Sequence, residues 1–193
     1  MIVLGLTGSI GMGKTTTARI FRQLGVPVFD ADRCVHDLYE GTAVEPLARI
    51  FPTAIREGRI NRNELGVLVL ADAEGMSKLE AVVHPLVQAQ RTKFLDMMRN
   101  KGRTLAVVDV PLLFETGGSA DVDGIVVVSA RDCEQRERVL SRPGMDEVKL
   151  AAILKRQLPD VEKRRRAHFV VQTSGSIVST KRQIKIIIAC IVK

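Results

Sequence analysis

Aromatic side chains are scarce in this chain, which has no tryptophan and a single tyrosine, Tyr39. Proteins that bind single-stranded nucleic acid stack bases on aromatic rings, so this scarcity argues against that class. The net charge of +7 over 193 residues attracts anions of every kind, whether polynucleotides, membrane surfaces or small phosphorylated ligands. Charge alone does not rank these partners.

Cysteines are also few, and Cys34, Cys133 and Cys190 contain no CxxC pair. This odd, widely spaced set argues against a disulfide framework and a zinc site, and is typical of a reducing compartment. Long hydrophobic runs are missing too. The start MIVLGLTG has no basic segment, and IKIIIACIVK near the end is about half of the roughly 20 residues that a membrane span needs. We expect a cytoplasmic protein without signal peptide or membrane association, in which IKIIIACIVK is a buried element.

Apolar runs rich in valine alternate with helical patterns along the chain, without repeats or low-complexity linkers. Continuous apolar runs suit strands that are buried on both faces, as in a parallel sheet. Alternating strands and helices predict an α/β fold, a three-layer sandwich with a parallel central sheet. The predicted strands are 2–6, 26–30, 104–110, 124–130 and 167–171.

The expected domain organisation is a single domain over residues 1–193, with two additions to its core. The core comprises about 1–31, 103–130 and 167–193, while 32–102 lacks a central strand and predicts an all-helical lobe. The stretch 131–166 is helical and dense in arginine and lysine, which predicts a lid.

Three local patterns predict helix ends inside the lobe. Asn61 with Glu64, and Ser77 with Glu80, have the spacing of capping boxes at helix starts. Pro85 is expected to end or bend the second of these helices at His84.

The segment from Gly8 to Thr15 matches the pattern G-x-x-x-x-G-K-[ST] at each fixed position. The glycines allow backbone N–H groups to surround a phosphate at the N-terminus of the next helix, expected at 14–24. Lys14 is expected at the β- and γ-phosphates, and the Thr15 hydroxyl at Mg²⁺. A strand before the loop and a helix after it argue against a chance match, so the sequence predicts binding of a nucleoside triphosphate.

P-loop proteins include switches, motors and small-molecule kinases. No N-K-x-D guanine signature occurs, and the chain is short for a motor. A short chain with a helical insertion and an Arg-rich segment fits a small kinase, in which arginines neutralise charge during phosphoryl transfer.

Over about residues 2–171, the sequence resembles the dephospho-CoA kinase family. The resemblance is carried by the ordered series GLTGSIGMGKTT, VFDAD, GRINRNEL, LEAVVHPLV, VVDVPLLFE and QRERVLSR, followed by Gln157. It implies ATP-dependent phosphorylation of the ribose 3′-hydroxyl of dephospho-CoA with Mg²⁺, the last step of coenzyme A synthesis. The nucleotide-binding residues implied are Gly8, Gly11, Met12, Gly13, Lys14, Thr15 and Thr16.

Asp32, the second acid of VFDAD, falls where the family has a carboxylate at the acceptor ribose. There it would accept a hydrogen bond from the hydroxyl and take its proton as transfer proceeds. The alternative is that Asp32 caps a helix that starts at Arg33. For Asp30 we favour a structural or solvated role.

Asp109 ends the apolar run LAVV at the Walker B position, the usual route to Mg²⁺ through water. Leu112 belongs to the turn expected to pack beneath the acceptor. Glu115 has two alternatives, a Mg²⁺-bound water or a residue of the lobe.

Further substrate and lid residues come from the resemblance. His84 is implied to shape the acceptor lobe, and Arg62 to contact an acceptor phosphate, the alternatives being a structural histidine and a solvated face. Arg138 and Arg142 lie four apart, as on one helix face, and one of them is implied to close over ATP. The block of residues 163–166 is interpreted as a solvated helix end.

Two residues depart from the family pattern ADFVI-x-N-x-G, since His168 replaces an aspartate and Thr173 an asparagine. This bears on how adenine is contacted near 172–175. The competing hypotheses are a nucleoside monophosphate kinase, a nucleic-acid-binding P-loop protein and an ATP-binding regulator. We expect ATP and dephospho-CoA as partners, no nucleic acid, and a monomer rather than an obligate oligomer.

Overall fold

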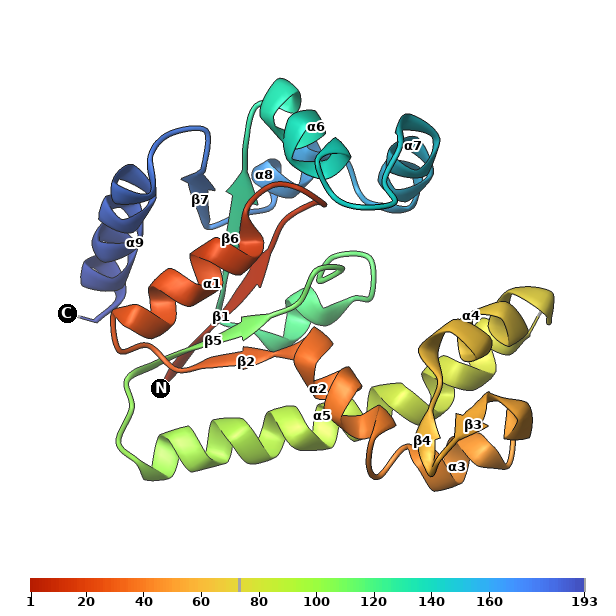
Figure 1. Cartoon of the computed structure of the whole chain (residues 1–193). Helices are drawn as coiled ribbons and strands as arrows, with labels where there is room; N and C mark the ends of the chain where they lie inside the picture. The colour runs from red at the N-terminus through yellow and green to blue at the C-terminus, as the bar shows by residue number, and fades with distance from the viewer. Residues whose placement is uncertain (73, 193) are drawn as a thin grey trace. The chain divides into compact units, whose positions relative to one another are not determined.

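The structure, a computed structural model, describes residues 1–72 and 74–192. The chain divides into two compact units (Figure 1). The first, the core unit, comprises Met1–Phe29 and Met98–Lys193, and the second, the inserted unit, comprises Asp30–Met97.

A five-stranded sheet of order β2-β5-β1-β6-β7 organises the core unit. Parallel pairing places Leu4 of β1 opposite Val107 of β5 on one side and Gly124 of β6 on the other. β7 pairs in parallel with the outer side of β6. The strands are β1 Ile2–Thr7, β2 Val28–Asp30, β5 Leu105–Asp109, β6 Gly124–Ser129 and β7 Phe169–Gln172.

Both faces of this sheet are covered, which confirms the prediction of a parallel central sheet. Val126 and Val128 of β6 lie in a cluster with Phe21 on one face, together with Ile184. The alternate residue Val127 packs with Leu113 on the other face. Successive strand residues point to opposite faces, so a strand covered on both sides needs apolar residues throughout.

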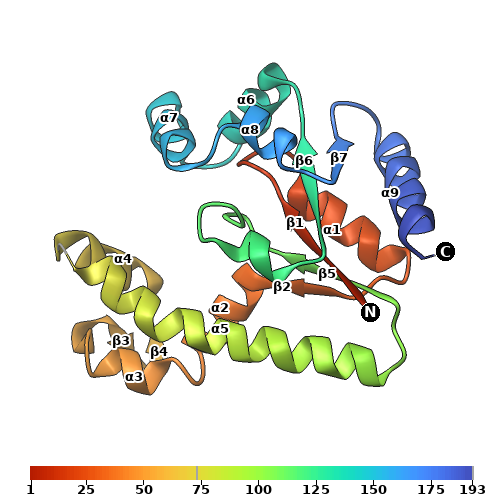
Figure 2. The ribbon, with the colours of Figure 1, turned by 180° about the vertical axis from the view of Figure 1, so that it is seen from behind.

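Five helices lie wholly within the described residues of the core unit. α1 and α9 contact each other on one face, whereas α8 contacts β6 on the other, as Figures 1 and 2 show. α6 and α7 contact each other beyond β6. Their bounds are α1 Lys14–Gln23, α6 Asp132–Leu140, α7 Glu147–Arg156, α8 Asp160–Arg165 and α9 Ile177–Ile191, with a 3-10 turn η2 at Gly118–Asp121.

The apolar C-terminal segment forms most of α9, and only one face of it is buried. Ile184 and Ile187 are buried, whereas Ile186 is 55% exposed. The expectation of a buried element therefore holds for one helix face and is wrong for the other. Among the described residues, no helix is both long enough and apolar enough to cross a membrane.

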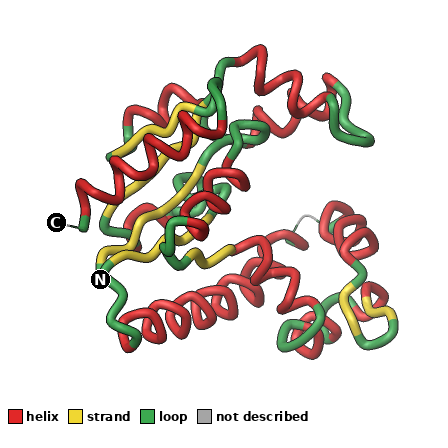
Figure 3. The backbone as a smooth tube through the Cα atoms, turned by 60° about the vertical axis from the view of Figure 1, so that its left-hand side comes forward, coloured by secondary structure: helices red, strands yellow, loops and turns green. Residues whose placement is uncertain are grey.

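The inserted unit contains four helices among its described residues and a two-stranded hairpin, so the prediction of an all-helical lobe is wrong (Figure 3). Glu57 and Gly58 both have positive φ, 49° and 75°, between the strands. A two-residue turn with this geometry suits the twist of a hairpin. The elements are α2 Ala31–Tyr39, α3 Val44–Ala48, η1 Pro52–Ala54, β3 Ile55–Arg56, β4 Arg59–Ile60, α4 Arg62–Ala71 and α5 Gly75–Asn100, the last ending in the core unit.

One predicted helix start is correct, the other is wrong, and of the two alternatives given for Pro85, an end or a bend, the end does not occur. The Asn61 side chain accepts hydrogen bonds from the backbone N–H groups of Asn63 and Glu64, so Asn61 caps α4. Ser77 lies inside α5, which begins at Gly75. α5 also continues through Pro85, whose missing N–H costs one helical hydrogen bond but does not end a helix of 26 residues.

Candidate active site

The P-loop connects β1 to α1, and its glycines are required by its backbone. Gly11 and Gly13 have φ angles of 76° and 92°, in the left-handed region that other residues rarely adopt. A Cβ at Gly8 would lie 2.7 Å from the carbonyl oxygen of Val128. The loop therefore keeps its close approach to β6 and the curved backbone that anion binding needs.

Lys14 and Asp109 form an ion pair at the mouth of this loop. Lys14 Nζ lies 2.8 Å from Asp109 Oδ1, and the side chains are 15% and 3% exposed. Lys14 opens α1 and Asp109 ends β5, so the two adjacent strands bring them together. Thr15 on the first turn of α1 is exposed, whereas Thr16 is half-buried.

Side chains from distant segments hold the P-loop backbone. Ile10 donates its N–H to Gln157 Oε1 at 3.1 Å, and its carbonyl accepts from Gln135 Nε2 at 2.7 Å. The hydroxyl of Thr173 donates to the carbonyl of Met12, 2.7 Å away. Met12 itself is buried at 2% exposure. Three polar side chains thus determine the path of the loop between its glycines.

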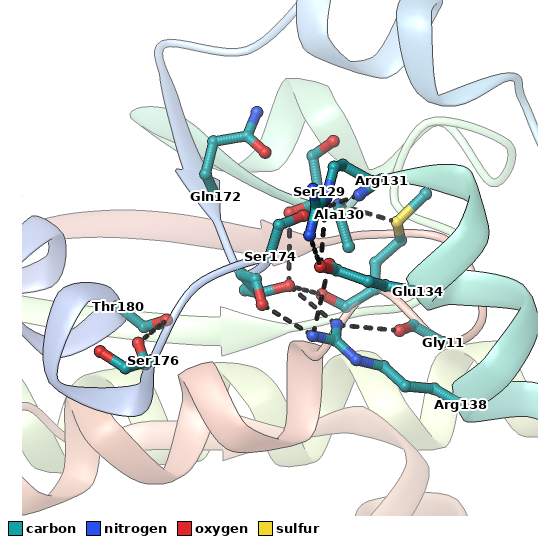
Figure 4. Close-up of polar contacts among 12 residues, drawn as sticks. Gly11, Ser129, Ala130, Arg131, Glu134, Arg138, Gln172, Ser174, Ser176 and Thr180 are labelled. Atoms are coloured by element: carbon teal, nitrogen blue, oxygen red, sulfur yellow. Dashed lines mark hydrogen bonds and ion pairs between the residues drawn. The ribbon is translucent and has the colours of Figure 1, made fainter. Parts of the chain in front are cut away.

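Arg138 is directed from α6 toward this loop, as Figure 4 shows. Its guanidinium donates to the Thr173 carbonyl at 2.7 Å and the Thr173 hydroxyl at 3.1 Å, and more weakly to the carbonyl of Gly11 at 3.5 Å. Arg138 therefore bridges the P-loop and the segment after β7.

Arg142 lies elsewhere, because α6 ends at Leu140. The expectation that Arg138 and Arg142 share one helix face is therefore wrong. Pro143 and Gly144 follow at once, and a proline disfavours helical backbone in the residue before it. The Arg142 side chain is exposed and forms no hydrogen bond or ion pair with the described residues.

Glu134 stands beside Arg138 in the same network (Figure 4). The hydroxyl of Ser174 and the guanidinium of Arg131 hold the pKa of the Glu134 carboxyl below its usual value. Its second oxygen, Oε2, lies 3.8 Å from Arg138 Nη2. This carboxylate stays ionised and favours the position of Arg138 over the loop.

In the inserted unit, Asp30 and Asp32 have different environments. Asp30 caps α2, since its side chain accepts a hydrogen bond from the N–H of Arg33 at 3.0 Å. The alternative that Asp32 is the cap is therefore wrong. Asp32 lies in the first turn of α2 and is exposed, and its side chain forms no hydrogen bond or ion pair with the described residues.

Arg62 and His84 are both exposed on helices of the inserted unit. Arg62 is the first residue of α4, and its charge acts on Tyr39. Burial raises the pKa of the Tyr39 hydroxyl above its usual value, and Arg62 opposes part of that shift. His84 lies within α5, one residue before Pro85.

The segment after β5 leads from Asp109 to Glu115. Leu112 is 39% exposed. Glu115 Oε1 lies 2.9 Å from Lys163 Nζ and accepts the N–H of Leu158 at 2.8 Å. Lys163 is fully buried, so the interpretation of residues 163–166 as a solvated helix end is wrong at its first residue. Neither predicted alternative for Glu115 matches this partner, which belongs to α8 of the core unit.

The sequence alone does not predict that Gln135, Gln157 and Thr173 hold the P-loop backbone. Gln157 belongs to the ordered series of family motifs and Thr173 departs from the family pattern, but neither feature of the sequence predicts which residue the side chain contacts. His168, the other departure, accepts the N–H of Ile125 through Nδ1 at 3.1 Å. It therefore supports the start of β6, opposite β7.

A glycine loop between a parallel strand and a helix, with its lysine on the carboxylate that ends the neighbouring strand, defines a P-loop kinase-type core. The sequence matches the dephospho-CoA kinase family over residues 2–179. The chain belongs to the dephospho-CoA kinase family.

Individual relatives agree with this assignment. Dephospho-CoA kinase of Brucella melitensis is 53% identical over 188 residues, which cover 97% of this chain and 94% of the relative. A crystal structure of a Thermus thermophilus protein is 37% identical with a TM-score of 0.86, covering 97% of this chain and 96% of that one. Dephospho-CoA kinase from Campylobacter jejuni shares the fold, with 23% identity, a TM-score of 0.68, and coverage of 98% and 96%.

Proposed function

We propose that this chain transfers the γ-phosphoryl group of ATP to the ribose 3′-hydroxyl of dephospho-CoA, giving coenzyme A and ADP. The observation that carries the proposal is the Lys14–Asp109 pair at the mouth of a P-loop, in a chain of this family. Phosphoryl transfer needs positioning and charge neutralisation more than covalent chemistry, and this loop supplies both.

ATP phosphates would lie against the N–H groups of residues 8–16, at the positive end of α1. The Lys14 ammonium group, now paired with Asp109, would then interact with the β- and γ-phosphates as well. The lysine side chain is 15% exposed, so a phosphate at the loop can reach it. The set Gly8, Gly11, Met12, Gly13, Lys14, Thr15 and Thr16 forms this proposed nucleotide site.

Mg²⁺ would be held by Thr15 and Asp109. A hydroxyl and a carboxylate are hard oxygen ligands that Mg²⁺ accepts together with waters and phosphate oxygens. The exposed Thr15 and the nearly buried carboxylate of Asp109 fit such an ion. Mg²⁺ would neutralise charge on the transferring phosphoryl group.

Asp32 is the proposed acceptor-side carboxylate. Its freedom from the capping role supports this, since Asp30 provides the cap for α2. It would accept the hydrogen bond of the ribose 3′-hydroxyl and take its proton during transfer. Arg62 and His84 are proposed to bind the acceptor within a lobe formed by about residues 32–102. Leu112 is proposed to bind it from the turn after β5.

Arg138, rather than Arg142, is the proposed lid arginine. The support is its double hydrogen bond to Thr173 beside Gly11, compared with an exposed Arg142. We further propose a lid at 131–166 and action as a monomer in the cytoplasm, without nucleic acid or membrane partners.

The test is incubation with ATP, Mg²⁺ and dephospho-CoA, followed by mass spectrometry of the acceptor. We expect a gain of one phosphoryl group and stoichiometric ADP. Phosphorylation of a nucleoside monophosphate but not of dephospho-CoA would indicate another small kinase. Binding of ATP without transfer to any acceptor would indicate a regulator.

A further inference from the structure

The buried ion pair between Glu115 and Lys163 lies outside the phosphate-binding residues. Lys163 is 0% and Glu115 17% exposed at the side chain, and the charged atoms are 2.9 Å apart. A buried ion pair repays its desolvation only with good additional contacts, so it is weak support for a purely stabilising role. The residues around the pair indicate an additional role for it.

Glu115 has a second partner next to the P-loop. The same oxygen, Oε1, accepts the backbone N–H of Leu158 at 2.8 Å. The preceding residue, Gln157, is the C-cap of α7, and its side-chain oxygen accepts a hydrogen bond from the N–H of Ile10 in the P-loop. Glu115 therefore fixes the backbone at Leu158, and the side chain of the neighbouring residue, Gln157, holds the P-loop.

Helix α8 is attached to the Glu115 segment and to β6. Arg166, just after α8, lies over the ring of Phe114 at 5.9 Å, beside the Glu115–Lys163 pair. At the start of α8, Asp160 accepts the hydroxyl of Ser129 at 2.8 Å. These contacts attach α8, and with it the preceding Leu158, to the sheet.

We propose that the Glu115–Lys163 pair is a positioning device, which fixes Leu158 so that Gln157 keeps the Ile10 turn of the P-loop in its phosphate-binding conformation. Glu115 and Lys163 are positioning residues in this account, since they act through Gln157 and not on the nucleotide. The proposal rests on ATP binding at the P-loop, a part of the proposed function.

The expected effect is on ATP affinity. One neutral hydrogen bond to the loop backbone contributes modestly, so its loss should weaken ATP binding about fivefold. A double variant, Glu115→Leu/Lys163→Met, removes the Leu158 contact without leaving a buried unpaired charge. The variant Gln157→Leu removes the Ile10 contact directly.

The test is a double-mutant cycle on the ATP dissociation constant, measured by calorimetry without acceptor. Each of these two variants should raise the constant about fivefold, and their combination also about fivefold rather than about 25-fold. Hydrogen exchange of the Ile10 amide should speed up in both. Glu162→Gln, which removes an exposed ion pair with Arg165 on the same helix, is the control and should change neither readout.

The inference would be overturned if Glu115→Leu/Lys163→Met and Gln157→Leu had additive effects on the ATP dissociation constant. It would also be overturned if the exchange rate of the Ile10 amide were unchanged in Glu115→Leu/Lys163→Met. Either result would leave the proposed function intact. If the unaltered protein did not bind ATP, both the inference and the proposed function would be overturned. If Glu115→Leu/Lys163→Met does not fold, Glu115→Gln/Lys163→Met takes its place. Its amide oxygen retains the Leu158 contact, so it should weaken ATP binding by less than Gln157→Leu, and an equal or larger loss would contradict the proposal.

Discussion

Two lysine–carboxylate pairs of nearly the same length lie in the core unit, Lys14–Asp109 at 2.8 Å and Lys163–Glu115 at 2.9 Å. In the first, the lysine is the more exposed partner, at 15% against 3%. In the second, the lysine side chain is fully buried, at 0% exposure, and the carboxylate is the more exposed partner, at 17%. The two pairs therefore differ in which charge a ligand can reach.

This difference separates a pair that a ligand can open from a pair that persists. An incoming phosphate can attract Lys14 without extracting it from the protein interior. Lys163 has no such route, because moving its charge away from Glu115 would leave an uncompensated buried ammonium. We therefore assign function in phosphoryl transfer to the first pair and positioning to the second.

The largest predicted effect comes from replacing the two lysines in turn. Lys14→Met should lower turnover about 10³-fold, because it removes a charge that stabilises the transferring phosphoryl group. Lys163→Met should lower the activity of the folded fraction about tenfold at most, but destabilise the protein by about 3–5 kcal/mol. Steady-state kinetics and urea unfolding measure both quantities. A larger activity loss in Lys163→Met than in Lys14→Met would erase the distinction between the pairs.

A third kind of carboxylate sharpens the comparison, namely one without a partner among the described residues. Asp32→Asn should lower turnover about 10²-fold and leave the ATP dissociation constant within about twofold, because it removes only the acceptor-side base. Asp30→Asn is the matched control, since asparagine caps a helix as well as aspartate does. If both variants lose equal activity, the assignment of Asp32 to the acceptor hydroxyl is wrong.

The two arginines give a smaller effect. Arg138→Ala should reduce turnover about tenfold or more, since it removes the guanidinium from the P-loop and from Thr173. Arg142→Ala is the comparison, and its exposed side chain predicts a change of about twofold or less. Initial rates at saturating ATP decide between them, and a reversed order would move the lid role to Arg142.

Acidification should release the Glu115–Lys163 pair. Burial raises the pKa of the Glu115 carboxyl, but Lys163 and the N–H of Leu158 lower it by more, so it lies below its ordinary value of 4.5. The stability that this carboxylate contributes is therefore fully present above pH 4.5 and is lost as the pH falls through the lowered value.

Urea unfolding at a series of pH values tests this linkage. Below pH 4.5, the unfolding free energy of the unaltered protein should fall more steeply than that of Glu115→Gln/Lys163→Met, which lacks the titrating group. Identical slopes would show that the carboxylate is not stabilised in the folded state.

The smallest effect is expected at Thr173. Thr173→Val keeps the shape of the side chain but removes the hydroxyl that donates to the Met12 carbonyl. The bond that Arg138 donates to the same hydroxyl is lost as well, so the change should destabilise the protein by about 1–2 kcal/mol and weaken ATP binding about threefold. Thermal unfolding and calorimetry measure these, and Thr180→Val, at a hydroxyl within α9, is the control for the loss of a hydroxyl.

Contiguous features of this molecule could be predicted from its sequence. The P-loop is recognised because its glycines, Lys14 and Thr15 lie within eight residues, and the apolar runs identified the central strands within a few residues. Asn61 was also predicted as a cap, since capping depends on neighbours three residues away.

Contacts between distant segments could not be predicted in this way. Lys163 stands in a run of basic residues, which normally indicates a solvated surface, and its partner Glu115 is 48 positions away. The hold of Gln157 on Ile10 spans 147 positions. The distinction between Asp30 and Asp32 depended on where α2 begins, and the two-residue difference between a start at Arg33 and the observed start at Ala31 changes which acid is the cap.

The position of the transferred phosphate is the most direct test of the central claim. The product formed from ATP, Mg²⁺ and dephospho-CoA should carry its new phosphate on the ribose 3′-hydroxyl, as determined by phosphorus and proton NMR, and should co-elute with coenzyme A. A phosphate at any other position, or ADP release without a phosphorylated acceptor, would contradict the account.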